Sequence, residues 1–486
     1  MGVGSDQTLC SLTIGSIFVK LNVSQSDTQA MSLAPTLKLT RKRLISFSLP
    51  EYSIYLCSIP ITLYIPYVYS THFGLELAHI GLILMLARIS DVITDPLIGF
   101  LSDRTNTRFG RRKPWMAVGA VVMMISAFQL FNPQFEVTNM YLLVWSILLW
   151  LGWTMINIPY YAWGAELSDN YDERTRITGW RQALAYMGNV TVLALPAVAG
   201  ELTGFGGLPE EGLTIIGSLA LIVLPVTIAA TLTLVPERNT YGIAKLSLAT
   251  NFKAVWKNGS FKLLWIAFML KYMGAAWGSA LFMLFAAHVV GARENIAAIL
   301  IGHYALQLIA LPMWVKLSER IGKKETYIIG GTLFSLVIPM FWFVGYGDLW
   351  LLVFVLSAVG ASGSYFTAIS MSMKADVIEI ASQRAGENVS GAYIAIWSLG
   401  QKMIGAVALG ICLPLLQYLG FDAQGDNGPR EIQILVNMYV IPQALMYIGA
   451  VAFIWRYPIT SKRLDKIRGA FERRKTRLNG FGHKPA

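Results

Sequence analysis

Long apolar runs separated by short polar segments fill the chain from about residue 44 to residue 455. A helix needs roughly 20 residues to cross a hydrocarbon core of about 30 Å. Runs such as 212–235 show no alternation of apolar and polar residues, which a strand of a membrane β-barrel would require. The pattern therefore predicts an all-α membrane protein with twelve transmembrane helices, near 44–70, 77–101, 114–132, 139–165, 178–200, 212–235, 261–287, 294–315, 325–345, 349–373, 389–418 and 432–455.

An internal repeat divides these helices into two groups of six. Leu101–Arg104 followed by Gly110–Lys113, after the second run, matches Leu317–Arg320 followed by Gly322–Lys324, after the eighth. Parallel six-helix repeats with a substrate site between them are a transporter architecture. We expect a poorly structured extension over 1–40, six-helix bundles over 41–235 and 261–456, a cytoplasmic linker over 236–260 and a basic tail over 457–486.

The first 40 residues are polar and lack a small-residue cleavage site, so they do not fit a signal peptide. Met31 is an alternative start to Met1, because the basic cluster Arg41–Arg43 lies directly before the first apolar run. We assign no function to this extension.

The composition excludes a soluble protein. Of the 486 residues 55% are hydrophobic and only 14% are charged, against roughly 25% charged in a soluble domain. The cysteines, Cys10, Cys57 and Cys412, are too scattered for a disulfide framework or a C-x-x-C site. The sequence has no Walker, Gly-x-Ser-x-Gly or His-Glu-x-x-His motif, so we expect no enzyme and no cofactor apart from a coupling ion, Na+ or H+.

The lysines and arginines predict the orientation. With the amino terminus in the cytoplasm, three of the 39 lie inside spans and only Arg293 and Arg430 lie in odd-numbered loops, which leaves 34 on the cytoplasmic side. The positive-inside rule then places both termini in the cytoplasm. We expect the protein in the inner membrane of a bacterium. Topology and anionic lipid explain the net charge of +11, so we expect no nucleic-acid partner.

The three basic residues inside spans are Arg88, Lys271 and Lys402. A charge at the bilayer centre costs about 2.5–3.5 kcal/mol on translocon scales. We therefore expect these side chains to face the interior of the bundle and to mark a pathway.

Two carboxylates share a helix face with Arg88. Arg88, Asp91, Thr94 and Asp95 follow helical spacing, so they lie on one side of the second span. Two carboxylates and a hydroxyl suit a hard monovalent cation such as Na+, while proximity of like charges favours proton binding by one carboxylate instead. The alternative is a fixed Arg88–Asp91 ion pair.

Lys402 lies some 13 residues into the eleventh span, too deep for easy snorkelling to the interface. We interpret it as the electrostatic partner of Asp91 or Asp95 across the two halves. Release of the lysine when a cation binds is one route by which the ion can alter substrate affinity.

A sugar offers an apolar ring face and several hydroxyls, so its site needs aromatic and hydrogen-bonding side chains. The candidates are Tyr55, Asn157, Tyr161, Arg181, Lys271, Phe366 and Thr367. For each aromatic residue, the alternative to sugar binding is simple packing. For Lys271, the alternative is packing or snorkelling of the side chain to the interface.

Charged residues of the repeated loops are candidates for an inner gate that closes when the cavity opens outward. They are Asp103, Arg104, Arg111, Glu319 and Arg320, with Asp376 and Glu379 as counter-charges. For the basic residues of this set, the alternative to a gate is that they only determine the membrane topology. Acidic residues contribute little to topology, so this alternative does not explain them.

Several motifs closely resemble one family over residues 38–456. They are Ala87–Gly99 with Asp103-Arg104 and Gly110–Trp115, Asn157–Tyr161 with Trp163–Leu167, Arg174–Arg176 with Gly179–Arg181, and Ala375–Glu379 followed by Lys402. They resemble the glycoside-pentoside-hexuronide:cation symporters, the melibiose permease branch of the major facilitator superfamily. The resemblance implies alternating-access symport of a sugar or sugar acid with a cation. It also implies that Thr154 is a further cation ligand, that Lys402 pairs with the carboxylates, and that Asn157 and Tyr161 occupy sugar-binding positions.

The chain departs from the melibiose permeases in its substrate pocket. Tyr55 and Asn157 match two sugar-binding aspartates of those proteins, while Lys271 adds a positive charge. We therefore hypothesise an anionic sugar, with a neutral glycoside as the alternative. Thr94, where some relatives have asparagine, leaves both Na+ and H+ open.

Other function classes remain as alternatives: a carrier of an amphipathic or lipid-like solute, and a non-transporting membrane receptor or assembly factor. For the latter the intramembrane charges would be a destabilising relic. We expect the chain to act as a monomer.

Overall fold

The structure, a computed structural model, describes residues 40–167, 171–205, 208–237, 255–292, 296–385, 389–460 and six residues between 463 and 473. Within these residues twelve helices are long and apolar enough to cross a membrane, which confirms the predicted number of spans. All of them belong to the unit Thr40–Ala486. The predicted extension before Thr40, most of the linker and most of the tail lie outside the described residues.

The first six spans are built from eight helices: α2 (Arg41–Leu63), α3 (Ile65–Thr71), α4 (Leu77–Ile89), α5 (Asp91–Arg104), α6 (Lys113–Phe131), α7 (Asn139–Glu166), α8 (Tyr171–Thr203) and α9 (Pro209–Leu234). The second six are α11 (Gly259–Phe285) with the π-helical turn η1 (Ala286–Val290), α12 (Ile296–Ile321), α13 (Lys323–Val337) with the 3-10 segment η3 (Ile338–Phe343), α14 (Leu349–Ala385), α15 (Ser390–Tyr418) and α16 (Pro429–Trp455).

The second span is interrupted at Ser90, between α4 and α5. The Ser90 carbonyl accepts from the backbone amides of both Ile93 and Thr94, at 3.0 Å each. Its hydroxyl donates to the Ala87 carbonyl at 2.7 Å. Such local side-chain bonds compete with the regular helical ladder. The interruption lies directly before Asp91, so the two carboxylates of this span both belong to the second segment.

Helix α14 extends to Ala385, where the sequence predicted an end at 373. The prediction followed the apolar run, but the polar residues beyond it contain no proline and continue the helix. At 37 residues the helix is roughly 55 Å long, well beyond the hydrocarbon thickness. Asp376 and Glu379 therefore lie on a helix that projects out of the apolar layer.

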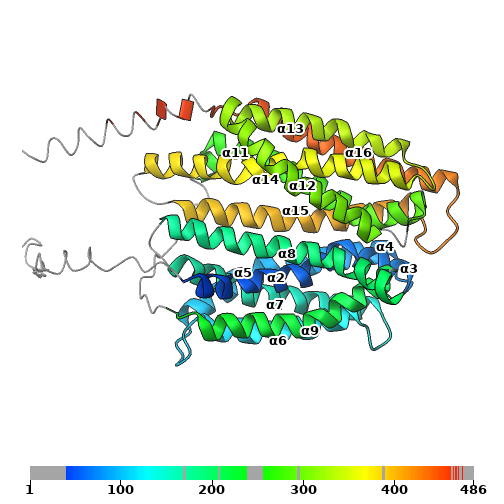
Figure 1. Ribbon diagram of the computed structural model, residues 1–486, viewed down its shortest axis with the longest axis horizontal. Helices are drawn as coiled ribbons and strands as arrows, with labels where there is room; N and C mark the ends of the chain where they lie inside the picture. The colour runs from blue at the N-terminus through cyan, green and yellow to red at the C-terminus, as the bar shows by residue number, and fades with distance from the viewer. Residues whose placement is uncertain are drawn as a thin grey trace, which may run out of the picture. The chain divides into compact units, whose positions relative to one another are not determined.

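The helices run side by side and alternate in direction (Figure 1). We call the side at which α2 begins and α16 ends the terminal face, and the other side the opposite face. The loops after α5, α7, α12 and α14 lie at the terminal face, because each of these helices completes an even-numbered span.

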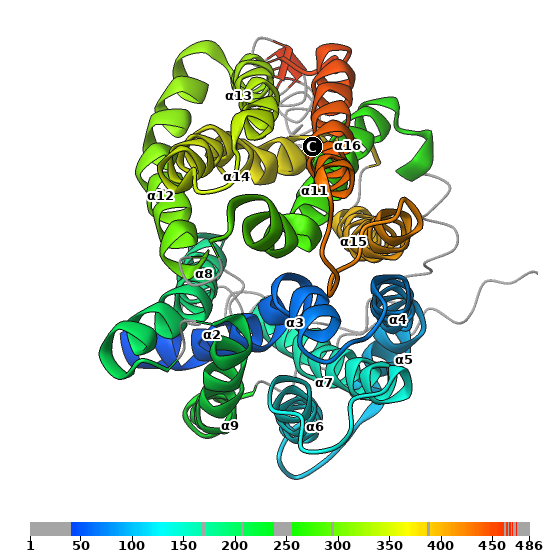
Figure 2. The ribbon, with the colours of Figure 1, turned by 90° about the vertical axis from the view of Figure 1, so that its right-hand side faces the viewer.

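The two halves approach each other most closely through α4 and α15, and through α8 and α12 (Figure 2). Gly81 of α4 has no space for a Cβ beside the Leu409 carbonyl and Pro414 of α15. Nearer the opposite face, the Gln417 side-chain oxygen accepts from the Ala78 amide at 2.7 Å. In the described part of the chain, α5 approaches the C-terminal half much less than α4 does. The halves are therefore joined mainly toward the opposite face.

Candidate functional site

Two aspartates of α5 and a lysine of α15 meet at the contact between the halves. The Lys402 Nζ lies 2.5 Å from Asp95 Oδ2 and 3.2 Å from Asp91 Oδ2. Only 8% of the Lys402 side chain and 1% of the Asp91 side chain are exposed. Removing one partner of a buried ion pair costs about 3–5 kcal/mol. This contact is therefore a strong electrostatic link between the two halves.

Arg88, in the last turn of α4, completes the cluster. Its Nη1 donates to Asp91 Oδ2 at 2.9 Å, and its Cζ lies 3.6 Å from the centroid of the Trp150 ring. The structure thus contains the Arg88–Asp91 pair and the Lys402 bridge at the same time. Two cations face two carboxylates, and the cluster is formally neutral.

Additional oxygen atoms suited to a small cation surround this cluster. Thr154 of α7 donates its hydroxyl to Asp95 Oδ1 at 2.9 Å. Asp91 Oδ1 and Thr94 Oγ1 are buried and have no hydrogen-bond partner among the described residues. Hard cations prefer such oxygen ligands. The group fits Na+ if the Lys402 ammonium moves away, and a proton on one carboxylate would satisfy the same charge balance.

Arg181 of α8 is held by Glu51 of α2, which was not predicted as a site residue from the sequence. Glu51 Oε1 accepts from Arg181 Nε at 2.9 Å and from Nη2 at 2.5 Å. The guanidinium also lies 4.1 Å from the centroid of the Tyr161 ring. Because Glu51 is only 4% exposed, it balances the Arg181 charge inside the N-terminal half. An acidic residue within the first apolar run was the available signal.

Aromatic and hydroxyl side chains from both halves meet beside this ion pair. Tyr55 of α2 lies within electrostatic reach of Tyr186 and Tyr272. Phe366 of α14 packs edge-on against Tyr272, with ring centroids 5.3 Å apart. Tyr186 of α8 lies close to the side chain of Thr367 of α14. The predicted substrate residues of α2, α8 and α14 are thus gathered in one region between the halves.

Asn157 lies between this region and the cation cluster. Thr154, Asn157 and Tyr161 follow helical spacing, so they share one face of α7. Asn157 is fully buried, and neither of its side-chain amide atoms has a hydrogen-bond partner among the described residues. A buried polar group without a partner costs about 1–3 kcal/mol. This side chain is therefore poised to gain a partner when a neighbour rearranges.

Lys271 of α11 is the exception among the three basic residues predicted inside spans. Its Nζ lies 4.3 Å from the Phe334 ring centroid and 4.7 Å from that of Tyr447. No carboxylate of the described residues forms an ion pair with it. Desolvated cation–π contacts contribute about 2 kcal/mol each, which is comparable to the cost of about 2.5–3.5 kcal/mol for the charge in the membrane. The Lys271 charge is therefore offset by aromatic rings, without the counter-charge that Arg88, Arg181 and Lys402 have.

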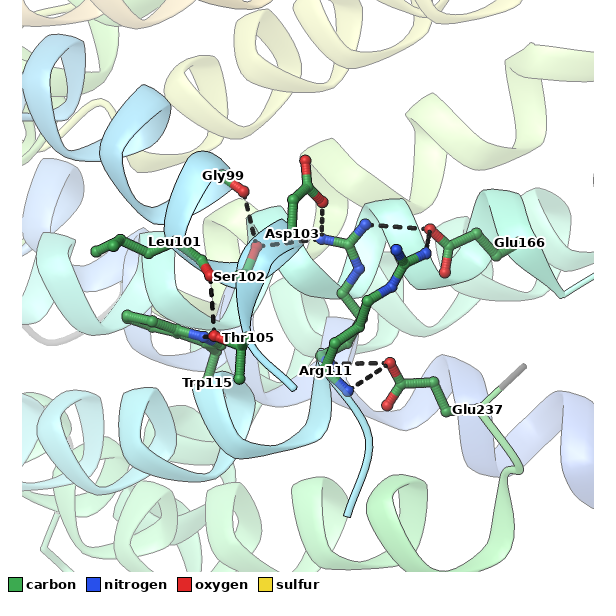
Figure 3. A network of polar contacts seen from close by, with 10 residues as sticks. Gly99, Leu101, Ser102, Asp103, Thr105, Arg111, Trp115, Glu166 and Glu237 are labelled. Carbon is green, nitrogen blue, oxygen red and sulfur yellow. Dashed lines mark hydrogen bonds and ion pairs between the residues drawn. The ribbon is translucent and has the colours of Figure 1, made fainter. Parts of the chain in front are cut away.

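The charged loop after α5 forms a network at the terminal face (Figure 3). Arg112 contacts Asp103 at 2.5 Å and Glu166 at 3.1 Å, while Arg111 contacts Glu166 at 2.7 Å. Glu237 accepts from the backbone amides of Arg111 and Arg112, at 3.0 and 2.9 Å. These contacts join residues of the N-terminal half to one another and to Glu237 at the start of the linker.

The C-terminal half has a corresponding contact. Lys323, the first residue of α13, has its Nζ 2.5 Å from Asp376 Oδ2 of α14. Glu379 accepts a hydrogen bond from Gln383 at 3.2 Å. The repeated loops therefore each bind an acidic residue near the end of a long helix of their own half. Among the described residues, the ion pairs of Asp103, Arg111 and Asp376 stay within one half.

The remaining predicted gate residues lie at the surface. Arg104 is exposed and lies over the Phe100 ring, 3.8 Å from its centroid. Glu319 and Arg320 are also exposed, and neither forms an ion pair with a described residue. The structure therefore gives these three residues no contact that joins the two halves.

Comparison with known proteins identifies relatives along nearly the whole chain. A family model described as MFS/sugar transport protein matches residues 46–461. The inner membrane symporter YicJ of Escherichia coli (strain K12) is 23% identical over 433 residues, covering 86% of this chain and 92% of that protein. The putative glycoside/cation symporter YagG of the same organism is 24% identical, covering 82% and 88%. A sodium-dependent lysophosphatidylcholine symporter of Danio rerio is 24% identical, covering 79% of each chain.

Solved structures share the arrangement of helices. A bacterial homolog of the human lysosomal transporter Spinster superposes with a TM-score of 0.65 at 13% identity, covering 88% of this chain and 99% of that one. At this identity the similarity concerns the fold, which agrees with the predicted twelve-helix architecture.

Proposed function

Because the chain belongs to the MFS/sugar transport protein family, in the melibiose-permease-like branch of the major facilitator superfamily, we propose that it couples entry of a sugar or sugar acid to a cation gradient. The family membership confirms the resemblance found in the sequence motifs. This membership makes the chain an integral membrane symporter, and we propose its substrate and its coupling ion.

The observation that carries the proposal is the bridge from Lys402 to Asp91 and Asp95. The cluster is neutral as it stands, so an incoming Na+ or proton makes it positive unless the lysine withdraws. Withdrawal breaks an ionic contact between the halves and frees them to rearrange. Ion binding is thereby linked to the alternation of access, as reciprocal coupling requires.

The substrate site is proposed beside the Glu51–Arg181 pair. Tyr55, Tyr161 and Phe366 supply aromatic surface, and Thr367 supplies a hydroxyl, which suits a ring with an apolar face and several hydroxyls. The face of α7 that carries Thr154 and Tyr161 connects this site to the cation cluster. A shift of α7 on ion binding therefore changes both sites.

We assign the terminal face to the cytoplasm of a bacterium, since it carries most lysines and arginines. The halves then meet on the outer side and separate toward the inner side. The loop networks of Arg112 and Lys323, satisfied within their own halves here, are the groups available for contacts between halves when the inner side closes.

The second candidate is a carrier of an amphipathic solute, favoured by the similarity to a lysophosphatidylcholine symporter. A long acyl chain needs an extended apolar channel. The region between the halves instead borders the buried ion pair of Glu51 and Arg181 and contains several hydroxyls. This polarity favours the sugar.

The experiment is reconstitution in proteoliposomes with a panel of labelled monosaccharides, glycosides and sugar acids. Counterflow identifies the substrate without any ion gradient, and imposed Na+ and proton gradients are then tested separately. We expect at least one sugar to exchange and to accumulate under one of the two gradients. Exchange of lysophospholipid but of no sugar would support the second candidate, and accumulation unaffected by either gradient would refute symport.

A further inference from the structure

A cavity in the C-terminal half adjoins the proposed substrate site, because Lys271 in its wall has its Nζ 5.6 Å from the ring centroid of Phe366. Its volume is about 290 Å³, and α11, α12, α14 and α16 supply most of its wall. Ile59 and Thr62 of α2 close it from the other half. The cavity therefore touches both halves, as a site whose occupant follows alternating access must.

Lys271 is the charged side chain of this wall, which has no acidic residue. Three other intramembrane cations are each balanced by a carboxylate: Arg88 by Asp91, Lys402 by Asp91 and Asp95, and Arg181 by Glu51. In the part of the chain that the structure describes, Lys271 has no carboxylate partner, and its ammonium lies over the rings of Phe334, Phe366 and Tyr447. An anion in the cavity would supply the missing charge.

The remaining wall suits a hydroxylated ring. His303 Nδ1 lies 2.8 Å from the Leu356 carbonyl, so this nitrogen donates and Nε2 is left as an acceptor. Phe334 and Tyr447 present aromatic surface next to Lys271. Ligand pockets for drug-sized molecules start near 300 Å³, so the cavity has room for one sugar ring.

We propose that this cavity is an anion subsite, in which Lys271 binds the carboxylate of an acidic sugar and so determines substrate charge. The inference rests on the proposed function as a sugar symporter. Arg181, predicted from the sequence as a second donor, has its charge taken by Glu51, so the selection of an acid is assigned to Lys271 alone.

The test is calorimetric titration of the purified full-length protein with D-glucuronate and D-galacturonate, each against its parent hexose. We expect each acid to bind at least about tenfold more tightly than its hexose, a difference of about 1.4 kcal/mol. Lys271→Met should lower the affinity for the acid at least about tenfold and change that for the hexose by less than about twofold. Lys271→Arg should keep the preference.

Two further variants keep the test decisive. Gln443→Glu places a carboxylate in the same cavity and should abolish the acid preference even if Lys271→Met does not fold. Lys374 lies outside the cavity wall, with its Nζ 5.3 Å from the Trp397 ring centroid. The Lys374→Met variant is therefore the matched control and should leave the acid preference intact.

The outcomes separate the two proposals. If hexose and acid bind equally, or if Lys271→Met and Gln443→Glu both retain the preference, the anion subsite is refuted while sugar symport stands. If no sugar or sugar acid binds the wild-type protein, both proposals fail together.

Discussion

Four ionised side chains balance one another where the halves meet, and this balance determines what each substitution does. Arg88 and Lys402 contribute two positive charges, and Asp91 and Asp95 two negative ones. A fifth charge, that of the coupling ion, therefore enters only by displacing one of the cations. Lys402 is the one that comes from the other half, so its displacement changes the contact between halves.

Lys402→Ala should uncouple transport. The variant leaves Arg88 facing two carboxylates, so the cluster becomes negative and retains its cation whatever the state of the substrate site. We expect Na+ or proton binding to persist while gradient-driven accumulation falls severely, at near-normal membrane levels of the protein. Accumulation measured in proteoliposomes that is indistinguishable from wild type would assign Lys402 to simple packing.

Glu51→Gln should destabilise the protein by leaving the buried Arg181 charge without a partner, at a cost of about 3 kcal/mol. The double variant Glu51→Gln with Arg181→Gln should recover much of the loss, because no lone charge remains. The measurement is the temperature at which half of the protein is inactivated in detergent, compared between Glu51→Gln, Arg181→Gln and the double variant. Equal stability of Glu51→Gln and wild type would mean that the pair is not a structural ion pair.

Helical spacing predicted part of the candidate cation site. The positions of Arg88, Asp91 and Asp95 on one helix face follow from residues three and four apart. The Glu51–Arg181 pair joins residues 130 positions apart, and no periodicity within one span encodes such a contact. The choice of Asp376 as partner of Lys323 likewise depends on how α14 packs beside α12.

At the scale of elements, the second and eleventh spans hold the halves together at two levels. Gly81 allows α4 to approach the backbone of α15, and Gln417 binds the first turn of α4 near the opposite face. The Lys402 contact with α5 lies further toward the terminal face. Before a substrate can enter from the opposite face, the contacts that Gly81 and Gln417 make between α4 and α15 must separate.

A cross-link between Glu76→Cys and Gln417→Cys should therefore stop transport. The two native side chains are 3.3 Å apart at their nearest polar atoms, so a short bifunctional thiol reagent should join them readily. Cys10 is replaced by alanine, while Cys57 and Cys412 are buried and are kept. We expect uptake to fall below about a tenth of the uncross-linked rate and to recover on cleavage of the link. Full uptake by the cross-linked protein would contradict alternating access at this contact.

At the scale of the whole molecule, hydropathy predicted the twelve spans well because each must cover the same apolar thickness. It did not predict the interruption at Ser90 or the extension of α14 to Ala385, since both depend on backbone hydrogen bonds and on helix continuation in polar sequence. The substrate region was predicted only as a set of candidates, because its assembly requires contacts between spans far apart in the chain.

The orientation of the molecule can be tested by labelling intact cells with a membrane-impermeant maleimide. Tyr346→Cys lies in a loop of the opposite face, where the native side chain is 84% exposed, and should be labelled from outside. Arg320→Cys lies at the terminal face and should react only after the cells are permeabilised. The reverse pattern would invert the proposed topology.

Ion coupling at the Asp91, Asp95 and Lys402 cluster is tested with the Asp95→Asn variant in proteoliposomes containing the substrate found by counterflow. Asp95 is the carboxylate nearest to Lys402, so the amide should neither recruit the coupling ion nor respond to it. We predict that counterflow exchange persists while accumulation under the imposed ion gradient falls to about the external concentration. Asp348→Asn, in an exposed loop of the opposite face, serves as the control and should accumulate substrate normally. Full gradient-driven accumulation by Asp95→Asn would contradict the assignment of this cluster as the site of ion coupling.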